Sequence, residues 1–550
     1  MNICNGIRKG FAMEWRKKEG CYEAWLPLDF LPPEARFVYR NANNMEPLDA
    51  ASCCAGLAPF VTDVPSQDVI VFGNEATSDY ILAGAKTAFR SLTYFFLHKE
   101  LRITGLLMRQ PHIKPSEKPE EIVILRGNDW RQLLLQYAEI SAAAMGVKKP
   151  NPEKNLTGYC TWYYYYADVT EKDFLENVEV LKKHVGTGYS PDVIQIDDGY
   201  QTFQGDWLDQ DSSWPTPLSK IAADIRSAGI TAGIWLMPFL ASTASRTFRE
   251  HPEWFVKNHE GKPLVFAGWS PAPDNHWACL DATLPETREH MTCFMRKLWD
   301  MGFHYFKMDG LAFGMPNGVF SDPDATPVSA FRLGLKTIRE AVPEAFLLGC
   351  CPPFMACLGY TDMCRVSSDT SRAWIGSGTE ALSEPLNADQ PSVGILPALR
   401  GTIANWWKAD IWFRADPDVI MARADNAYYT IGEARLSAAM GILTGVALTS
   451  DHLGRITQER LDILERAAKF RLKNALPENW RPFNWPYVFS GTVDGKKALL
   501  LLNISGQPKE FLFSDHGLPE ICSEKLIGLG TVEKSLTLQP HDAALIIAEI

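Results

Sequence analysis

Val193-Ile-Gln-Ile-Asp-Asp-Gly-Tyr200 is a short, mostly apolar run that ends in two carboxylates and a glycine. Similar runs alternate with amphipathic stretches between residues 157 and 455, and each has the length of a buried strand. The candidate strands are Tyr159–Tyr166, Val193–Tyr200, Thr231–Phe239, His304–Leu311, Ala345–Cys351, Asp362–Asp369, Asp410–Arg414 and Val446–Asp451. This alternation favours an α/β fold with a (β/α)8 TIM barrel over a doubly wound sheet, because no Gly-rich GxGxxG turn follows an early strand.

Helix signals fill the gaps between these strands. Thr170-Glu-Lys-Asp173 has the spacing of a capping box, which predicts a helix that continues to about His184. A second helix is expected over Ser219–Gly229, where the glycine favours a helix end. Two more are expected over Pro285–Met301 and Pro327–Val342, each opened by a proline.

The residues before the barrel have a different pattern. They lack sustained helical spacing and carry short apolar runs such as Asp68–Phe72 and Ser91–Phe96, which predicts a mostly β domain. A helix over Asp129–Ile140 leads out of it, and the polar stretch Lys148–Asn155 is typical of a linker.

The residues after the barrel turn to β structure again. A helix is expected over Thr457–Lys473, and Val493-Asp-Gly-Lys496 predicts a hairpin turn. Apolar strands are expected over Ala498–Asn503 and Ala543–Ala548, in a small antiparallel domain. We therefore expect three units, over residues 1–150, 151–455 and 456–550.

Composition excludes several classes of protein. The formal net charge is −12, so a phosphate backbone is repelled on average and a nucleic-acid partner is not expected. No apolar run is long enough to span a membrane, and the N-terminus does not resemble a signal peptide, which predicts a cytoplasmic protein without a membrane partner. The 12 cysteines include no CxxC and no zinc-like spacing, so we expect reduced thiols, no metal and no cofactor.

The ends of the candidate strands carry the reactive residues, and a barrel places function at this C-terminal face. Because side chains alternate along a strand, Lys307 and Asp309 point to one side, and the lysine lowers the pKa of the carboxyl. Asp309 and Asp369 lie on different strands and form a candidate pair of the kind that retaining glycosidases hold about 5–5.5 Å apart. The strand ends are Asp197-Asp198-Gly199, Gly233-Ile-Trp235, Lys307-Met-Asp309, Gly349-Cys350-Cys351, Arg365-Val-Ser-Ser-Asp369 and Arg414-Ala-Asp416-Pro-Asp418.

Each of these signals has a structural alternative. Lys307 and Asp309 are compatible with an interior salt bridge, Asp197-Asp198 with a helix cap, and Trp235 with a core residue. Carboxylates beside an aromatic wall at successive strand ends favour carbohydrate chemistry, because the apolar face and the hydroxyl rim of a sugar need different partners.

The order and spacing of these blocks resemble glycoside hydrolase family 36, which consists mainly of α-galactosidases. The blocks are Trp162-Tyr163, Gln195–Gln201, Gly205–Leu208, Gly233–Trp235, Pro238-Phe239, His251–Trp254, Leu280-Asp281, Tyr305–Asp309, Leu348–Cys350 and Arg365 with Asp369-Thr370. The resemblance covers residues 157–455. It implies an N-terminal β-supersandwich, a (β/α)8 catalytic barrel and a small C-terminal antiparallel β domain.

The resemblance also implies roles for individual residues. Asp309 matches the family nucleophile in its K-x-D motif, and Asp369 matches the general acid/base. Asp197 and Asp198 match the pair that binds the galactose 4- and 6-hydroxyls. The other matches are Lys307 (3- and 4-hydroxyls), Trp235 (wall of the −1 subsite), Cys350 (near the 2-hydroxyl) and Arg365 (orientation of the site). The family's aromatic segment in the N-terminal domain is expected near residues 51–60, which are small and sulfur-rich here.

The function implied is retaining hydrolysis of terminal α-D-galactosides, with an α-galactoside or related oligosaccharide as the partner and without a metal or cofactor. The alternatives are an α-N-acetylgalactosaminidase, a raffinose-synthase-type α-galactosyltransferase and a barrel that binds sugar without turnover. Family members are often dimers or tetramers, so a homo-oligomer is compatible with the resemblance.

Overall fold

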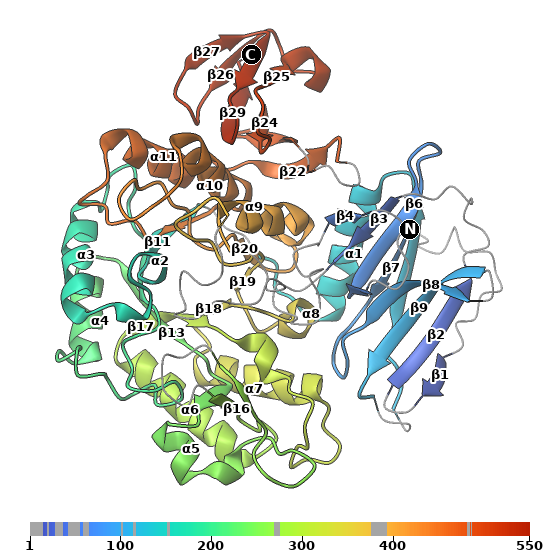
Figure 1. Ribbon diagram of the computed structural model, residues 1–550, viewed down its shortest axis with the longest axis vertical. Helices are drawn as coiled ribbons and strands as arrows, with labels where there is room; N and C mark the ends of the chain where they lie inside the picture. Colours follow the sequence, from blue (N-terminus) through green and yellow to red (C-terminus); the bar gives the residue numbers. More distant parts are fainter. Residues whose placement is uncertain are drawn as a thin grey trace.

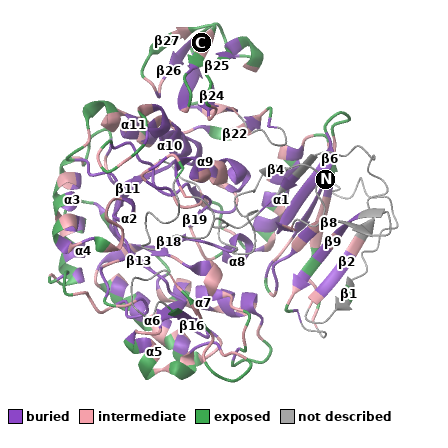
Figure 2. Cartoon of the chain, viewed as in Figure 1, coloured by how far each residue is buried: buried purple, intermediate pink, exposed green. Residues whose placement is uncertain are grey.

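The computed structural model describes residues 15–18, 21–27, 37–41, 56–58, 65–100, 103–113, 117–150, 154–268, 276–375, 393–480, 485 and 487–549. In Figure 1 a central barrel carries two β-sheets along one side, in blue, and a smaller β unit at the top, in red. The barrel strands and the helix α10 (Ile431–Thr444) are mostly buried, as Figure 2 shows in purple. The sequence of α10 is small or apolar on nearly every side, which is typical of a helix enclosed by its neighbours.

Eight parallel strands form the barrel in the order β20-β19-β18-β17-β13-β12-β11-β21. They are β11 (Leu156–Cys160), β12 (Val193–Ile196), β13 (Thr231–Leu236), β17 (Phe303–Met308), β18 (Phe346–Gly349), β19 (Met363–Arg365), β20 (Arg414–Asp416) and β21 (Val446–Thr449). The remaining gap between β20 and β21 is bridged just after β20, where the Ile420 N–H donates to the Leu448 carbonyl at 2.7 Å. The predicted (β/α)8 barrel is confirmed.

Two strand predictions need correction. The first strand was expected over Tyr159–Tyr166, but β11 ends at Cys160 and Trp162–Tyr165 form a helical turn, α2. The backbone carbonyl of Tyr163 accepts a hydrogen bond from the buried Arg423 at 2.6 Å, which favours the turn over an extended chain.

The seventh strand was expected over Asp410–Arg414, but β20 begins only at Arg414. Asp410 has a left-handed backbone with φ 61°, and such a residue interrupts an extended chain. The strand therefore starts after this turn and runs to Asp416.

Helices cover the outside of the barrel close to their predicted positions. The Thr170 hydroxyl and the Asp173 carboxyl form the expected capping box on α3. The helix bounds are α3 (Glu171–Lys183), α4 (Leu218–Ser227), α5 (Arg246–Glu250), α6 (Pro285–Asp300), α7 (Pro327–Ala341), α8 (Phe354–Cys357), α9 (Ile395–Ala404) and α11 (Gln458–Lys469). A small antiparallel sheet of β14 (Leu240–Ser242), β16 (His276–Cys279) and β15 (Val265–Ala267) follows β13.

The N-terminal residues form two five-stranded antiparallel sheets that pack face to face. Their shared core contains Phe95, Leu97 and Leu106 from one sheet and Ile70 and Phe72 from the other. One sheet has the order β1 (Trp15–Lys18), β2 (Cys21–Pro27), β9 (Ile103–Pro111), β8 (Tyr94–Glu100), β5 (Pro65–Gln67). The other has the order β10 (Ile122–Gly127), β7 (Asp79–Ala85), β6 (Val69–Asn74), β3 (Phe37–Arg40), β4 (Gly56–Ala58), and α1 (Trp130–Ala144) packs against β7 and β10.

The C-terminal residues form a six-stranded antiparallel sheet and a two-stranded one. The expected hairpin joins β23 and β24 through the Asp494-Gly495 turn. The larger sheet has the order β22 (Lys473–Glu478), β23 (Val488–Val493), β24 (Lys496–Asn503), β29 (Asp542–Ala548), β26 (Ile521–Glu524), β27 (Gly530–Glu533), and the smaller one pairs β25 (Lys509–Leu512) with β28 (Ser535–Leu538). The helix expected over Thr457–Lys473 ends at Lys469, because β22 begins at Lys473.

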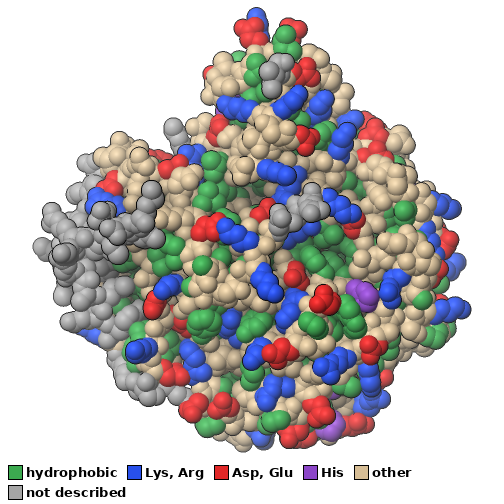
Figure 3. Space-filling view, turned by 180° about the vertical axis from the view of Figure 1, so that it is seen from behind, with side chains coloured by type: hydrophobic (Ala, Val, Ile, Leu, Met, Phe, Trp, Pro, Cys, Tyr) green, Lys and Arg blue, Asp and Glu red, His purple; other side chains and the backbone are tan. Residues whose placement is uncertain are grey.

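The surface mixes charges of both signs. On the face shown in Figure 3, basic and acidic side chains are interspersed over the barrel. Within the described part of the chain, no helix combines the length and the apolar character needed to cross a bilayer. The domain limits at residues 150 and 455 stay a prediction.

Candidate active site

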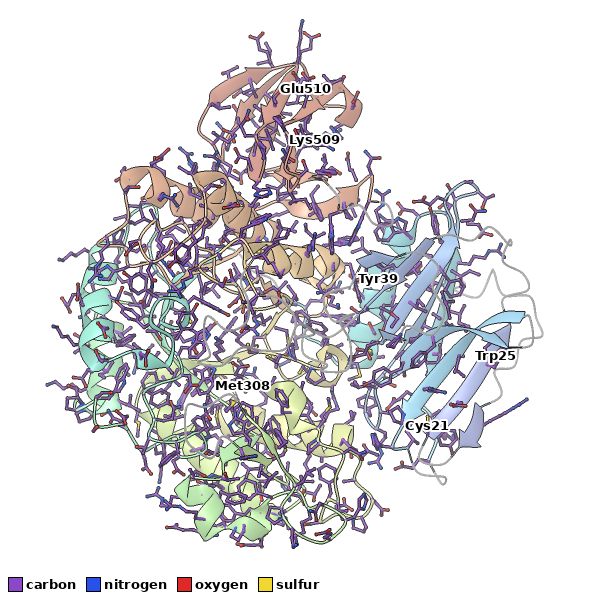
Figure 4. All side chains as sticks on the ribbon, in the orientation of Figure 1. Cys21, Trp25, Tyr39, Met308, Lys509 and Glu510 are labelled. Carbon is purple, nitrogen blue, oxygen red and sulfur yellow. The ribbon has the colours of Figure 1, made fainter. Side chains whose placement is uncertain are left out.

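All eight predicted site residues lie at the C-terminal ends of barrel strands. Asp197 and Asp198 follow β12, Trp235 lies in β13, and Cys350 follows β18. Lys307 lies in β17 and Asp309 directly follows that strand; Met308, labelled in Figure 4, stands between them. Arg365 ends β19, and Asp369 stands four residues further along the chain.

The Asp309 carboxylate is held from three sides. Its Oδ2 accepts from the Trp235 indole at 3.0 Å, and its Oδ1 accepts from the Gly310 N–H at 2.7 Å and from the Cys351 thiol at 3.4 Å. Burial raises the pKa of Asp309, but the charges of Lys307 and Arg365 together with these hydrogen bonds outweigh it, so the pKa lies below its ordinary value. Asp309 is therefore ionised at neutral pH.

Lys307 pairs with Asp197 rather than with Asp309. The two are buried, and the Lys307 Nζ lies 2.8 Å from the Asp197 Oδ2, which also accepts from the Gln195 amide at 2.6 Å and the Cys160 thiol at 3.2 Å. Burial lowers the pKa of Lys307, but the Asp197 carboxylate reverses this and raises it well above the ordinary value. Lys307 thus forms an interior salt bridge, but with Asp197 instead of Asp309.

Asp198 is buried beside two amides. Gln201 and Gln204 donate to its two oxygens at 2.5 Å and 3.1 Å, and the Trp277 indole holds Gln204 at 2.9 Å. Burial raises the pKa of Asp198 to about 6. The helix-cap alternative for Asp197-Asp198 is wrong, because α4, the next α-helix along the chain, begins only at Leu218.

Arg365 connects Asp369 to the rest of the site. Its Nη2 lies 2.7 Å from the Asp369 Oδ1, and its own side chain is only 4% exposed whereas that of Asp369 is 42% exposed. A buried cation thus holds a carboxylate that solvent still reaches. The core alternative for Trp235 is partly right, since its ring is buried edge-on against Trp207, yet its indole N–H serves Asp309.

Four further residues that are not among the predicted site residues complete the site. Cys351 donates to Asp309, and its Sγ also lies 3.5 Å from the Arg365 Nη2, while the expected place of Cys350 near the 2-hydroxyl stays a prediction. Asp416 and Asp418 are buried near Arg365, as is Tyr163. The available signal was two carboxylates two residues apart at the end of a strand, Asp416-Pro-Asp418.

One group near Asp309 has the donor types of a metal site. A carboxylate oxygen of Asp309 and the sulfurs of Cys350 and Cys351 lie within 4.8 Å of one another. Thiolate and carboxylate are ligands that Zn²⁺ accepts. The absence of a metal stays a prediction. The aromatic segment expected near residues 51–60 falls mostly outside the described residues.

Comparison with known proteins gives this geometry a context. A family model described as Melibiase matches residues 181–312. An α-galactosidase from Escherichia coli is 28% identical over 124 residues, which are 21% of this chain and 16% of that protein. An A type blood alpha-D-galactosamine galactosaminidase from Flavonifractor plautii is 29% identical over 121 residues, which are 21% of this chain and 11% of that protein.

Solved structures extend the likeness to the fold. TtGalA, an α-galactosidase from Thermus thermophilus in complex with p-nitrophenyl α-D-galactopyranoside, superposes with a TM-score of 0.66 at 23% identity, over 90% of this chain and 95% of that one. The family 36 α-galactosidase AgaA from Geobacillus stearothermophilus superposes with a TM-score of 0.62 at 11% identity, over 96% and 76%. The chain resembles the α-galactosidases of glycoside hydrolase family 36.

The sequence likeness to these α-galactosidases is local. This chain matches no more than about a sixth of the length of the two curated relatives. The Melibiase match includes Asp197, Asp198 and Asp309 but ends before Cys350 and Asp369. The assignment of Cys350 and Asp369 therefore rests on the spacing of the sequence blocks and on their place in the barrel, outside the family-model match.

Proposed function

We propose that this chain is a retaining glycosidase that releases terminal α-D-galactosyl units from α-galactosides. The observation that carries the proposal is a pair of carboxylates, from the ends of β17 and β19, that share the charge of one buried guanidinium. Arg365 helps to lower the pKa of Asp309, and it pairs with the more exposed Asp369 at 2.7 Å. Such a pair suits one carboxylate that attacks and one that exchanges protons with the leaving group and with water.

The reaction has two steps in this proposal. Asp309 attacks C1 of the galactosyl unit while Asp369 gives its proton to the departing oxygen, and a β-galactosyl-enzyme forms through an oxocarbenium-like transition state. Asp369 then takes a proton from water, and the water oxygen attacks C1 and displaces Asp309. α-Galactose leaves, and both carboxyls return to their starting protonation states.

The other predicted residues bind and orient the sugar in this proposal. Asp197 and Asp198 accept from the 4- and 6-hydroxyls, and their rigid support by Lys307 and two glutamines suits the recognition of an axial 4-hydroxyl. Trp235 lines the −1 subsite while its indole orients Asp309. The remaining assignments are Lys307 to the 3- and 4-hydroxyls, Cys350 near the 2-hydroxyl and Arg365 to orientation of the site.

The anomer released first tests the proposal. Proton NMR during hydrolysis of p-nitrophenyl α-D-galactopyranoside is expected to show α-galactose first and the β-anomer only later, by mutarotation. Appearance of the β-anomer first would mean inversion, and the assignment of Asp309 as nucleophile would be wrong. No release from this substrate or from raffinose and stachyose would overturn the proposed activity as a whole.

A second candidate is an α-N-acetylgalactosaminidase. It is in keeping with the relative from Flavonifractor plautii, which is named for galactosamine, a sugar with nitrogen at the 2-position, and with the small thiols of Cys350 and Cys351 close to Asp309. A parallel reaction with p-nitrophenyl N-acetyl-α-D-galactosaminide separates the two. Faster release from this substrate would keep the two-carboxylate chemistry and change the sugar assigned to the pocket.

A further inference from the structure

Asp418 reaches both the residue after Asp369 and Arg365 from a position just beyond the neighbouring strand. Its Oδ2 accepts the N–H of Thr370, the residue directly after Asp369, at 2.9 Å. Its Oδ1 lies 3.9 Å from the Arg365 Nη1, whereas Asp369 binds the other terminal nitrogen, Nη2. Both Arg365 and Asp418 have side chains that are only 4% exposed. Asp418 is therefore in contact with the backbone and with the charge that hold Asp369.

The backbone at Asp418 is itself constrained. Its φ is 74°, a left-handed conformation that residues other than glycine, asparagine and aspartate rarely adopt. Its N–H donates to the Asp416 carboxyl at 3.1 Å, and Asp416 belongs to β20, which pairs with β19. The position of Asp418 is thus set by the sheet that also carries Arg365.

Carboxyls outnumber cations around this point. The cations are Lys307 and Arg365, and Lys307 is already paired with Asp197. Arg365 faces Asp369 and Asp418 directly, and it acts together with Lys307 on Asp309 and Asp416. Burial, the largest influence, raises the pKa of Asp416 to about 7 and that of Asp418 to about 6. The Tyr163 hydroxyl contacts Asp418, and burial keeps it neutral by raising its pKa well above its ordinary value.

This excess of carboxyls over cations matters for the proton transfer in the proposed reaction. In the proposed reaction Asp369 gives its proton to the leaving group while its carboxyl lies 2.7 Å from the Arg365 guanidinium. A second carboxylate on the same guanidinium shares its charge. Asp418 is the carboxyl with direct contact to both Arg365 and the Asp369-Thr370 backbone.

We propose that Asp418 is a positioning residue that fixes the Asp369 loop and shares the charge of Arg365, so that Asp369 can carry the proton it delivers. This inference rests on the proposed function. It adds no proton transfer to the reaction: the proton still passes from Asp369 to the leaving oxygen and returns from water. Asp418 acts only through the place and the charge environment of Asp369.

Asp418→Asn separates charge from position. Asparagine tolerates the left-handed backbone, and its amide oxygen can still accept the Thr370 N–H. The variant removes a carboxylate that shares the charge of Arg365 above about pH 6, where Asp418 is ionised, so we expect weaker proton delivery by Asp369 in that range. The loss of kcat/KM with rising pH should then begin about one pH unit lower, and kcat/KM for raffinose at pH 7 should fall by about tenfold.

A substrate that needs no proton provides the contrast. Fluoride leaves from α-galactosyl fluoride without a general acid, so kcat/KM for this substrate should change by less than about threefold in Asp418→Asn. Asp418→Ala also removes the acceptor for Thr370, and it should lower kcat/KM for both substrates. Asp425→Asn is the matched control: it removes one charge from the same β20–α10 segment, and its carboxyl binds Tyr164 at 2.6 Å. It should keep the wild-type pH profile.

The outcomes distinguish the inference from the proposed function. An active wild type whose Asp418→Asn variant loses both substrates equally, with an unmoved alkaline limb, would show a merely structural role and overturn the inference alone. Unchanged kcat/KM for both substrates in Asp418→Asn would also overturn the inference and leave the proposed function standing. A folded wild type that hydrolyses neither raffinose nor the fluoride would overturn the proposed function and the inference together.

Discussion

The barrel mouth and the seam between the N-terminal sheets and the barrel both bury cations, but they surround them differently. At the mouth, Lys307 and Arg365 face carboxylates, and one of these, Asp369, is still 42% exposed. At the seam, Lys408 is completely buried, and its ammonium donates to the amide oxygens of Asn41, at 2.6 Å, and Asn405. We call Lys408, Asn41, Asn405 and the aromatic rings of Phe354 and Trp407 the Lys408 seam.

Aromatic faces complete the seam. The Lys408 Nζ lies 4.4 Å from the ring centre of Phe354 and 4.7 Å from that of Trp407. The Trp407 indole donates at 2.7 Å to the hydroxyl of Tyr39, which Figure 4 labels on the sheet that faces the barrel. Burial lowers the pKa of Lys408 well below its ordinary value. Here a completely buried lysine joins two parts of the chain.

The difference shows what a buried charge needs in order to take part in chemistry. The mouth holds more carboxyls than its cations can balance, so several of them have pKa values near neutrality or are kept ionised by a neighbour. The seam holds its lysine mainly with amide oxygens and rings, and the buried Asp68 is the carboxylate that acts on it. Changes at the mouth should therefore alter turnover and its pH dependence, and changes at the seam should alter only stability.

The largest effect is expected for Asp309→Ala. The variant loses the attacking oxygen, so kcat should fall by about 10⁴-fold or more while circular dichroism shows an intact fold. Azide should restore part of the turnover and yield β-galactosyl azide, because it enters the face that Asp309 vacates. Asp369→Ala is the matched comparison and should yield the α-azide from the galactosyl-enzyme. Turnover of Asp309→Ala near the wild-type rate would contradict the assignment.

Lys408→Ala tests the other side of the comparison. The change leaves a cavity between rings and two amide oxygens without their donor, which should lower the free energy of unfolding by about 2–4 kcal/mol. The seam meets the mouth where the Asn405 amide donates to the Val366 carbonyl at 2.8 Å, but this bond does not involve the Lys408 side chain, so the kcat of the folded variant should stay within about twofold of wild type. Stability is measured by urea unfolding and activity by initial rates.

A partly exposed lysine on aromatic rings is the control for this change. Lys509, labelled in Figure 4, lies 3.4 Å from the ring centre of Tyr487 in the C-terminal sheets. Lys509→Ala should cost less than about 1 kcal/mol. Equal losses for the two variants, or a fall in kcat for Lys408→Ala alone, would remove the distinction between seam and mouth.

Asp198→Asn is expected to have a smaller effect on catalysis than the loss of Asp309. The proposed role of Asp198 is to accept from a sugar hydroxyl, so kcat/KM should fall by about 10–100-fold at pH 7. In the wild type, kcat/KM should fall as the pH drops through about 6, because the Asp198 carboxylate then takes up a proton. The variant should lack this acid limb, and a variant that keeps it would assign the limb to another group.

The sequence predicts the barrel well because the signal is repeated along the chain. Each strand and helix is short and locally patterned, and a box such as Thr170–Asp173 marks a helix start without reference to the fold. The errors lie where a long-range contact or an unusual backbone decides, as at Tyr163, whose carbonyl binds Arg423, and at Asp410 with its φ of 61°. Neither feature is visible in the pattern of polar and apolar residues.

The candidate site shows the same difference between what the sequence pattern predicts and what long-range contacts decide. Residues such as Lys307 and Asp309 are found from the ends of strands, since the barrel itself brings those ends together. The pattern does not predict which partner each residue takes: Lys307 binds Asp197 from a different strand, and the Cys351 thiol donates to Asp309. Asp418 is 48 residues away from Thr370 along the chain, so only the folded barrel reveals that contact.

Asp416→Asn should show the smallest effect, and it concerns stability rather than turnover. The pKa of Asp416 in the folded protein is about 7, above its value of about 3.9 in an unfolded chain. Between these values the folded state holds a proton that the unfolded state has lost, so this group's contribution to stability falls as the pH rises from about 4 to 7. Asparagine does not titrate, and its oxygen can still accept the Asp418 N–H. The Tm of Asp416→Asn relative to wild type should therefore rise by about 1–3 °C between pH 5 and pH 8.

Asp211→Asn is the control for this pH dependence. Hydrogen bonds from the Ser213 N–H and hydroxyl lower the pKa of Asp211, so its titration lies below pH 5 and its contribution to stability is constant between pH 5 and pH 8. The Tm difference for this variant should be flat over that range. A flat difference for Asp416→Asn as well would mean that Asp416 is fully ionised throughout. The charge of Arg365 would then lower the pKa of Asp416 by more than burial raises it. The contrast between a mouth whose carboxyls titrate and a seam that does not titrate would have to rest on Asp198 and Asp418.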